Sequence, residues 1–360
     1  MKIIILSDAN SIHTRRWASA LSHKSIELIV FSLFALKEEL LSFYYNNKIR
    51  VISADLEKYG ITKYSPVLIK PIYFLALKKL KKEIKSFSPD LIHAHYASSY
   101  GILAALCKFK PYYISIWGDD IVIRKKNFLL KKLLKYSFKN SENLFSTSNI
   151  IDDHIKNEFN CRTTIIPFGV DTNLFKPIKA MKGKPIKIGI IKSLEPYNGI
   201  EYLIDAFNIL MKKKILDVEL KILGEGSNAK KLKKYVNNLG LNDHVIFEGQ
   251  IKHTDIVPYY NELSIFACPS LRESFGVSVL EASACGLPVI ANNIGGLKDI
   301  VVHGKTGYLI DTLNIKEFAF YLEKLILDND LRKKMGKNGR NFTKEKYEWS
   351  NCVDSLISNY

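Results

Sequence analysis

The sequence has no hydrophobic run long enough to cross a bilayer. Its longest apolar stretch, residues 28–36, spans nine residues and includes Ser32, whereas a membrane-spanning helix needs roughly 20 residues. The N-terminal segment MKIIILSD has an apolar core that is too short for a secretory signal. We therefore interpret this segment as a first β-strand and expect a cytoplasmic protein.

Cysteine is scarce and unpatterned. The five cysteines are widely scattered, and no two of them form a C-x-x-C pair, which argues against a zinc or dithiol redox site. We expect all five to be structural thiols in a reducing compartment. The chain also lacks tandem short repeats and low-complexity segments.

Arginine is rare in a strongly basic chain. The net charge is +17, yet 45 of the 53 basic residues are lysine. Such a charge favours an anionic partner, which means a nucleotide, a nucleic acid or a membrane surface. Because base-edge readout relies on the planar guanidinium group, sequence-specific nucleic-acid binding is disfavoured. A basic nucleic-acid-binding protein remains the least favoured alternative.

Strand-like apolar runs alternate with amphipathic helical stretches along the chain. The first series extends from 2–6 to 143–148, and a second series extends from 184–194 to 306–310. Runs separated by helical patterns indicate βαβ units and a parallel sheet. A chain of 360 residues is also too long for one comfortable core. We therefore expect an α/β fold with two Rossmann-like domains that face each other across a cleft.

A turn-rich segment separates the two series. Ile166-Pro-Phe-Gly-Val-Asp171 leads into the lysine-rich, weakly hydrophobic stretch 176–187. We expect an N-terminal domain over 1–170 and a C-terminal domain over 171–345. Residues 346–360 are expected to form a helix that packs back on the N-terminal domain.

The segment Glu273-Ser-Phe-Gly-Val-Ser-Val-Leu-Glu281 carries the strongest chemical signal. It follows a strand-like run and opens a helical one, so its first residues lie where parallel sheets bind ligands. The amides of Phe275, Gly276 and Val277 would then face an anion such as a diphosphate. Glu273 and Glu281 suit hydroxyl groups beside that anion. A surface helix with two solvated glutamates gives the same spacing, and the pair alone does not distinguish the two.

The surroundings of the glutamate pair favour the functional interpretation. The segment resembles the E-x7-E signature of family 4 glycosyltransferases, which have the GT-B fold. The resemblance covers nearly all of residues 165–310 through the segments IIPFGVDTNLFKP (165–177), LGEG (223–226), FEGQ (247–250), GLPV (286–289), NIGG (293–296) and HGKTGYL (303–309). It implies a retaining, hexosyltransferase-type enzyme that takes a sugar from a nucleotide diphosphate donor. The C-terminal domain would hold this donor, and the N-terminal domain would hold the acceptor.

The resemblance also implies roles in donor binding. Glu273 is expected near the hydroxyls of the transferred sugar, Glu281 on the ribose, and the amides of Phe275 and Gly276 near the phosphates. Gln250 and Ile251 would face the base. The full set of donor-binding residues is Gly224, Gln250, Ile251, Ser274, Phe275, Gly276, Val277, Glu281 and Asn198.

A basic pair normally neutralises the leaving diphosphate in the resembled family. Lys192 takes the first position, and we expect Lys192 and Glu273 to be the catalytic residues, although a solvated lysine at a strand end is the alternative for Lys192. Asn198 stands where a second cation is usual. The doublets Asp119-Asp120 and Asp152-Asp153 do not form a D-x-D at a strand end, so we expect neither a metal nor another cofactor.

Three N-terminal segments, 7–17, 89–101 and 115–120, resemble the family's acceptor-side motifs. The residues expected beside the acceptor are Asn10, Ser11, His13, His93, His95 and Asp119. His93 and His95 share a face of their strand because side chains alternate, and structural histidines are the alternative. Many relatives have glycines in the first segment, which here has none, and many have histidine where this chain has Trp117.

Two lysine-rich stretches, 76–87 and 124–139, could lie on an anionic bilayer. Ordinary amphipathic helices with solvated lysines are the alternative. The resemblance implies transfer from a UDP- or GDP-sugar to a lipid-linked glycan of a bacterial surface polysaccharide, such as O-antigen, capsule or exopolysaccharide. A sugar-nucleotide epimerase or a phosphorylase of the same fold is the alternative reaction.

Overall fold

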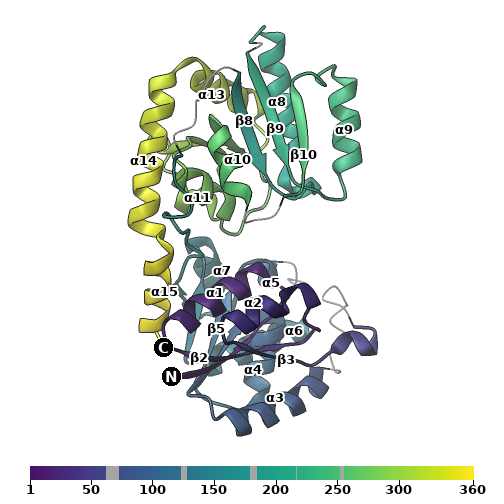
Figure 1. Cartoon of the computed structure of the whole chain (residues 1–360), viewed down its shortest axis with the longest axis vertical. Coiled ribbons are helices and arrows are strands. Elements are labelled where there is room, and N and C mark those ends of the chain that lie inside the picture. The colour runs from purple at the N-terminus through teal and green to yellow at the C-terminus, as the bar shows by residue number, and fades with distance from the viewer. Residues whose placement is uncertain (62–72, 123–127, 179–184, 216, 252–254) are drawn as a thin grey trace. The chain divides into compact units, whose positions relative to one another are not determined.

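Figure 1 shows the computed structural model of the chain, which describes all residues except 62–72, 123–127, 179–184, 216 and 252–254. Contacts divide the chain into two compact units, residues 1–166 with 353–360 and residues 167–352. Each unit has its own parallel sheet and its own hydrophobic core. The expectation of two Rossmann-like α/β domains is confirmed.

The first unit is built on a seven-stranded sheet in the order β3-β2-β1-β4-β5-β6-β7. Successive residues Ile3, Ile4 and Ile5 of β1 are fully buried, so both faces of this strand are covered, as in doubly wound folds. The strands are β1 (Lys2–Leu6), β2 (Glu27–Ser32), β3 (Arg50–Ser53), β4 (Leu91–His95), β5 (Tyr112–Ile116), β6 (Asn143–Ser146) and β7 (Thr164–Ile165). The helices are α1 (Ile12–His23), α2 (Leu41–Asn46), α3 (Tyr73–Phe87), α4 (Ile102–Cys107), α5 (Asp119–Val122), α6 (Phe128–Asn140) and α7 (Asn149–Phe159).

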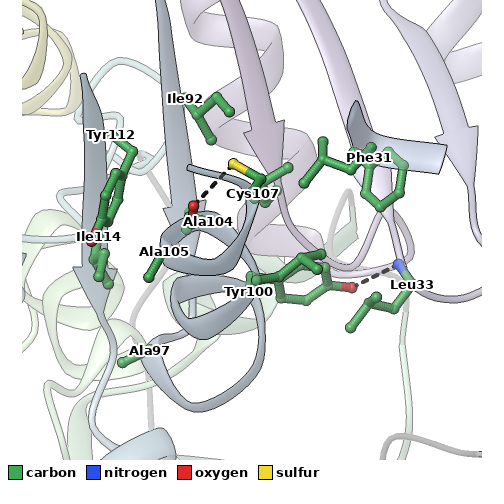
Figure 2. Packing of buried hydrophobic residues seen from close by; sticks show 14 of the residues in the cluster. Phe31, Leu33, Ile92, Ala97, Tyr100, Ala104, Ala105, Cys107, Tyr112 and Ile114 are labelled. Atoms are coloured by element: carbon green, nitrogen blue, oxygen red, sulfur yellow. Dashed lines mark hydrogen bonds between the residues drawn. The ribbon is translucent and has the colours of Figure 1, made fainter. Parts of the chain in front are cut away.

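The core of the first unit fixes the segment that follows β4. Figure 2 shows Tyr100 beside Leu33, where the Leu33 amide donates a hydrogen bond to the tyrosine oxygen at 3.2 Å. The Cys107 thiol donates to the carbonyl of Ala104 at 3.0 Å. The Tyr100 contact ties the turn Ala97–Gly101, which follows β4, to the end of β2.

The second unit is built on a six-stranded sheet in the order β10-β9-β8-β11-β12-β13. The strands are β8 (Ile186–Ile191), β9 (Val218–Leu223), β10 (Val245–Gly249), β11 (Ile265–Cys268), β12 (Val289–Asn292) and β13 (Gly307–Ile310). The helices are α8 (Ile200–Lys212), α9 (Ala229–Asn238), α10 (Ile256–Glu262), α11 (Val277–Ala284), α12 (Leu297–Ile300), α13 (Ile315–Leu327), α14 (Asn329–Tyr347) and α15 (Trp349–Ser358), the last of which ends in the first unit.

The strand order reverses at one point in each sheet. In the first sheet β1 lies beside β4, and in the second sheet β8 lies beside β11. Ligands of open parallel sheets bind at the carboxyl ends of the strands on either side of such a point. The loops after β1 and β4, and those after β8 and β11, are therefore the places to look for a site.

Candidate active site

Lys192 and Glu273 meet at the reversal point of the second sheet. Lys192 directly follows β8, Glu273 lies in the loop between β11 and α11, and the ammonium donates to Oε2 of the carboxylate. Both side chains are mostly buried, with exposed fractions of 17% and 13%. Burial alone would lower the pKa of Lys192, but the charge and hydrogen bond of Glu273, together with Cys268 and Tyr197, outweigh burial and the pKa is raised. The pair therefore keeps a protonated lysine at the edge of the sheet.

The loop after β9 comes very close to Lys192. Gly224 has a φ of 141°, and a Cβ added there would lie 1.9 Å from the carbonyl oxygen of Lys192. Only glycine accepts both this conformation and this contact. The Gly224 amide donates to the carbonyl of Gly249 at 2.7 Å, which links the turn to exposed Gln250 and half-buried Ile251.

Asn198 is engaged within its own loop. It is buried at the end of a short helical turn, Pro196–Asn198. Its side-chain amide donates to the carbonyl of Ser193 at 2.7 Å and to the Ser193 hydroxyl at 2.9 Å. Asn198 therefore positions Ser193, which is adjacent to Lys192, and the sequence contained no signal for this serine.

The first turn of α11 has hydrogen-bond donors without intramolecular acceptors. Gly276 caps the helix with a φ of 103°, and in the described part of the chain no hydrogen bond is donated by the amides of Phe275, Gly276 or Val277. The hydroxyl of Ser278 is buried without a partner. Half-buried Ser274 lies in the same loop. This arrangement can bind an anion, because amides and the helix dipole both favour negative charge there.

Glu281 lies one turn further along α11 and is 4% exposed. Its Oε2 atom accepts a hydrogen bond of 2.7 Å from the hydroxyl of Tyr260 on α10. Burial and the nearby carboxylate raise the pKa of Tyr260 well above its usual value. Sequence reasoning missed Tyr260, because it lies 21 residues before Glu281 and belongs to no local motif.

The two histidines of β4 differ in their surroundings. Their rings lie 4.6 Å apart and both are fully buried. His93 is bonded at both nitrogens, by the Tyr360 hydroxyl at 2.6 Å and the Ser115 hydroxyl at 2.8 Å. The Nδ1 atom of His95 is buried without a partner. Burial lowers the pKa of His95 to about 3, so this imidazole is neutral near pH 7.

The remaining acceptor-side residues lie in the loops after β1 and β5. His13 and His95 both contact the ring of Trp117, with ring centroids 5.6 Å and 5.0 Å from it. Asn10 is instead engaged internally, because its side chain donates to the carbonyl of Ala35 and accepts from the amide of Lys37. Ser11, which precedes α1, is half-buried. The side chain of Asp119 lies outside the described part of the structure.

One residue of each acidic doublet, Asp120 and Asp152, has structural partners. Asp120 accepts hydrogen bonds from the amides of Ala97 and Gly118, and burial raises its pKa to about 6. Asp152 accepts from Arg162 at 2.7 Å and from the amide of Thr163 at 2.7 Å. Among the residues that the structure describes, no group of three or more His, Cys, Asp or Glu side chains is arranged to hold a metal ion.

Two family models match the chain. Residues 171–342 match the model described as glycosyl transferases group 1, and residues 2–148 match the model described as glycosyl transferase 4-like. The first match contains Lys192, Glu273 and Glu281, and the second contains His93 and His95.

Similar proteins agree with these matches. An uncharacterised glycosyltransferase of Methanocaldococcus jannaschii is 32% identical over 284 residues, which is 77% of each chain. N-acetyl-alpha-D-glucosaminyl L-malate synthase of Bacillus anthracis is 25% identical over 85% of this chain and 81% of the relative. A GDP-mannose-dependent phosphatidylinositol monomannoside mannosyltransferase of Mycobacterium tuberculosis is 31% identical over 53% of this chain and 54% of the relative. In fold, the chain resembles Anabaena HepE in complex with UDP, with a TM-score of 0.82, 18% identity and 99% of both chains covered.

Proposed function

Because the chain belongs to the group 1 glycosyl transferases, which are of the family 4 type with the GT-B fold, we propose a specific reaction for it. It transfers a sugar from a UDP- or GDP-sugar to a hydroxyl of a lipid-linked glycan, with retention at the anomeric carbon. The product belongs to a bacterial surface polysaccharide, such as O-antigen, capsule or exopolysaccharide. The observation that carries this proposal is the Lys192–Glu273 pair beside the first turn of α11.

In the proposed site the donor lies across the carboxyl edge of the second sheet. The diphosphate binds the amides of Phe275–Val277 and the ammonium of Lys192. An ammonium has three donors, so Lys192 can bind a phosphate oxygen while it stays bonded to Glu273. The Glu273 carboxylate accepts from hydroxyls of the transferred sugar, Glu281 binds the ribose, and the loop at Gln250 and Ile251 faces the base.

The proposed chemistry needs no dedicated protein base. The acceptor oxygen attacks the anomeric carbon on the face from which the diphosphate leaves, so that the new glycosidic bond forms as the bond from carbon to phosphate oxygen breaks. The departing phosphate oxygen takes the acceptor's proton. Negative charge grows on the diphosphate as it leaves, and fixed donors aimed at that charge lower the barrier. Lys192 and the α11 amides are the groups placed to do this. Asn198, which stands where the family usually has a second cation, instead donates hydrogen bonds to Ser193, the residue next to Lys192.

The direct test is binding and transfer with a panel of UDP- and GDP-sugars. The purified protein should bind one class of sugar nucleotide, and adding a bacterial lipid extract should release the nucleoside diphosphate and leave a glycolipid with the donor's anomeric configuration. EDTA should not change the rate. A product that is an epimerised sugar nucleotide, or phosphate-dependent release of a sugar phosphate, would instead show an epimerase or a phosphorylase.

For the acceptor, we propose that the enzyme works in the cytoplasm on the inner face of the membrane. Helices α3 and α6 both pack against α4 in the first unit, and each turns lysines outward. Phe128 and Leu129 of α6 are 72% and 65% exposed, and Leu75 of α3 is 51% exposed. Exposed apolar side chains among lysines are typical of helices that lie on anionic lipid. Residues 124–127 of the stretch expected to contact membrane lie outside the described residues, and no helix of the described part is long and apolar enough to span a bilayer.

Vesicle binding tests this attachment. The protein should sediment with phosphatidylcholine vesicles that contain phosphatidylglycerol and remain in solution with pure phosphatidylcholine. Replacing Lys132, Lys135 and Lys139 of α6 by Glu should abolish sedimentation. Replacing Lys230, Lys233 and Lys234 of α9 by Glu makes the same charge change in the second unit and should have little effect. Equal losses in both variants would indicate an effect of net charge alone and would contradict a docking face on α6.

A further inference from the structure

The carboxylate of Glu281 accepts a hydrogen bond from a rigid, buried side chain. Tyr260 is fully buried, and its ring contacts the rings of Phe175 and Phe266, at centroid distances of 6.0 Å and 5.7 Å. Its hydroxyl donates to Oε2 of Glu281 at 2.7 Å. Because the phenol has only two side-chain torsions and its ring is fully buried against two other aromatic rings, the position of the hydroxyl is fixed.

The Tyr260 hydroxyl needs a hydrogen-bond acceptor, but this need does not explain why position 281 is a glutamate. A buried phenol is satisfied by any carbonyl or hydroxyl oxygen, whereas burying a carboxylate costs much more free energy than burying a neutral acceptor. Glu281 is nevertheless 4% exposed. A carboxylate kept at such a cost indicates a ligand that needs a strong acceptor, and Tyr260 is then the group that orients it.

Tyr260 also remains a hydrogen-bond donor across the working pH range. Burial and the proximity of Glu281 raise the pKa of the phenol well above its usual value. The tyrosine therefore stays protonated and can donate to Glu281 throughout this range.

We infer that Tyr260 is a positioning residue for donor binding, which fixes the Glu281 carboxylate in the orientation that accepts hydrogen bonds from the ribose hydroxyls. This inference rests on the proposed function, because it assumes that Glu281 binds the ribose. It assigns to Tyr260 a selective contribution to ribose recognition, separate from its contribution to folding.

Calorimetric titration with UDP and GDP, and with their 2′,3′-dideoxy counterparts, tests the inference on the full chain. Tyr260→Phe keeps the packed ring and removes only the hydroxyl. We expect Kd for the ribonucleotide to rise about 10-fold, as for loss of a hydrogen bond to a charged group, and Kd for the dideoxy form to stay nearly unchanged. Tyr235→Phe is the matched control, because Tyr235 also donates to a carboxylate, that of Asp205, but between α8 and α9. This control should keep the wild-type ratio of the two Kd values.

The outcomes separate the two proposals. If wild-type protein binds neither UDP nor GDP, the proposed function fails and the inference fails with it. If wild-type protein binds one of them but Tyr260→Phe weakens binding of the ribonucleotide and of the dideoxynucleotide equally, or weakens neither, only the positioning role of Tyr260 is overturned.

The double variant Tyr260→Phe with Glu281→Gln is a second test, for the case that the single variant folds poorly. It removes the Glu281 charge together with the Tyr260 hydroxyl. The ratio of Kd for the dideoxynucleotide to Kd for the ribonucleotide should be the same in the double variant as in Glu281→Gln alone, because the effects of residues that act as one unit do not add. Weaker ribonucleotide binding by the double variant than by Glu281→Gln would contradict the inference.

Discussion

At the scale of single residues, the Lys192–Glu273 pair affects stability and activity in different ways. Both side chains are mostly buried, so removing one leaves the other as an uncompensated charge. We expect Lys192→Met to lower the free energy of unfolding by about 3 kcal/mol, and Glu273→Gln to be destabilising for the same reason. Both single variants should also lower kcat, by about a hundredfold or more, because in the proposed reaction the pair lies where negative charge grows on the leaving diphosphate. Thermal melting and steady-state rates with the identified donor measure the two effects.

The double variant Lys192→Met with Glu273→Gln distinguishes these effects. Removing both charges should restore most of the melting temperature, because no unpaired charge remains. The rate should stay as low as in the worse single variant. A double variant that regains both stability and turnover would mean that the pair serves the fold alone.

His95 makes a second prediction at the residue scale, on the pH dependence of stability. Its pKa is about 3 in the folded chain, against about 6.5 in an unfolded one. Between these values the unfolded chain binds the proton and the folded chain does not, so stability falls as the pH falls from about 6.5 toward 3. Each unit of pH in this window costs up to about 1.4 kcal/mol.

Melting curves between pH 7 and pH 4.5 of wild type and His95→Phe check this expectation. The variant keeps an aromatic ring beside Trp117 but cannot take up the proton, so its melting temperature should fall less steeply with acid. His23→Gln removes an exposed histidine of α1 and should follow the wild type. Parallel curves for all three proteins would show that His95 does not limit stability in acid.

At the scale of elements, the loop after β9 gives the sharpest test of the site's geometry. A Cβ at Gly224 would lie 1.9 Å from the carbonyl oxygen of Lys192, so Gly224→Ala must displace one of the two loops. Gly240 also has a positive φ, of 68°, but nothing lies within 4 Å of its Cβ position. Gly240→Ala therefore shows the cost of backbone strain alone, about 1 kcal/mol.

We expect Gly224→Ala to lower the melting temperature more than Gly240→Ala and to weaken nucleoside diphosphate binding at least tenfold, because Lys192 moves with its loop. Gly240→Ala should bind as the wild type does. Thermal melting and calorimetric titration measure both effects. If both variants bound the nucleoside diphosphate with equal affinity, the loop after β9 would take no part in the proposed donor site.

The same scale shows what the sequence could predict. The strands were predictable because short apolar runs such as Ile3–Leu6 alternate along the chain with amphipathic helical stretches, a pattern typical of strands covered on both faces. The E-x7-E helix was predictable because its signal is local. The hydrogen bonds between Tyr260 and Glu281 and between Tyr360 and His93 could not be predicted, since each joins residues from distant elements. Side-chain packing decides such contacts, and periodicity in the sequence does not specify packing.

At the scale of the whole molecule, the net charge of +17 predicts how the protein behaves toward nucleic acid. Lysines on many faces attract phosphates without reading bases, and such binding falls steeply with salt because it depends on released counterions. The proposed donor site has a different physical basis, since helix amides and one mostly buried lysine would form a local site that salt screens less. Binding to DNA and binding to a nucleoside diphosphate should therefore respond differently to the same conditions.

We expect the protein to bind unrelated DNA duplexes with equal affinity at low salt and to lose this binding as salt rises to about 0.2 M. UDP or GDP binding should persist over this range, and excess duplex should not displace the nucleotide. Fluorescence anisotropy with two unrelated duplexes, and calorimetry at the same salt concentrations, make the comparison. One duplex that binds much more tightly than another at physiological salt, together with loss of nucleotide binding, would favour a nucleic-acid-binding protein. Loss of DNA binding at a salt concentration that leaves nucleotide binding unchanged would show that DNA is bound by diffuse surface charge and that the nucleotide is bound at a separate, local site.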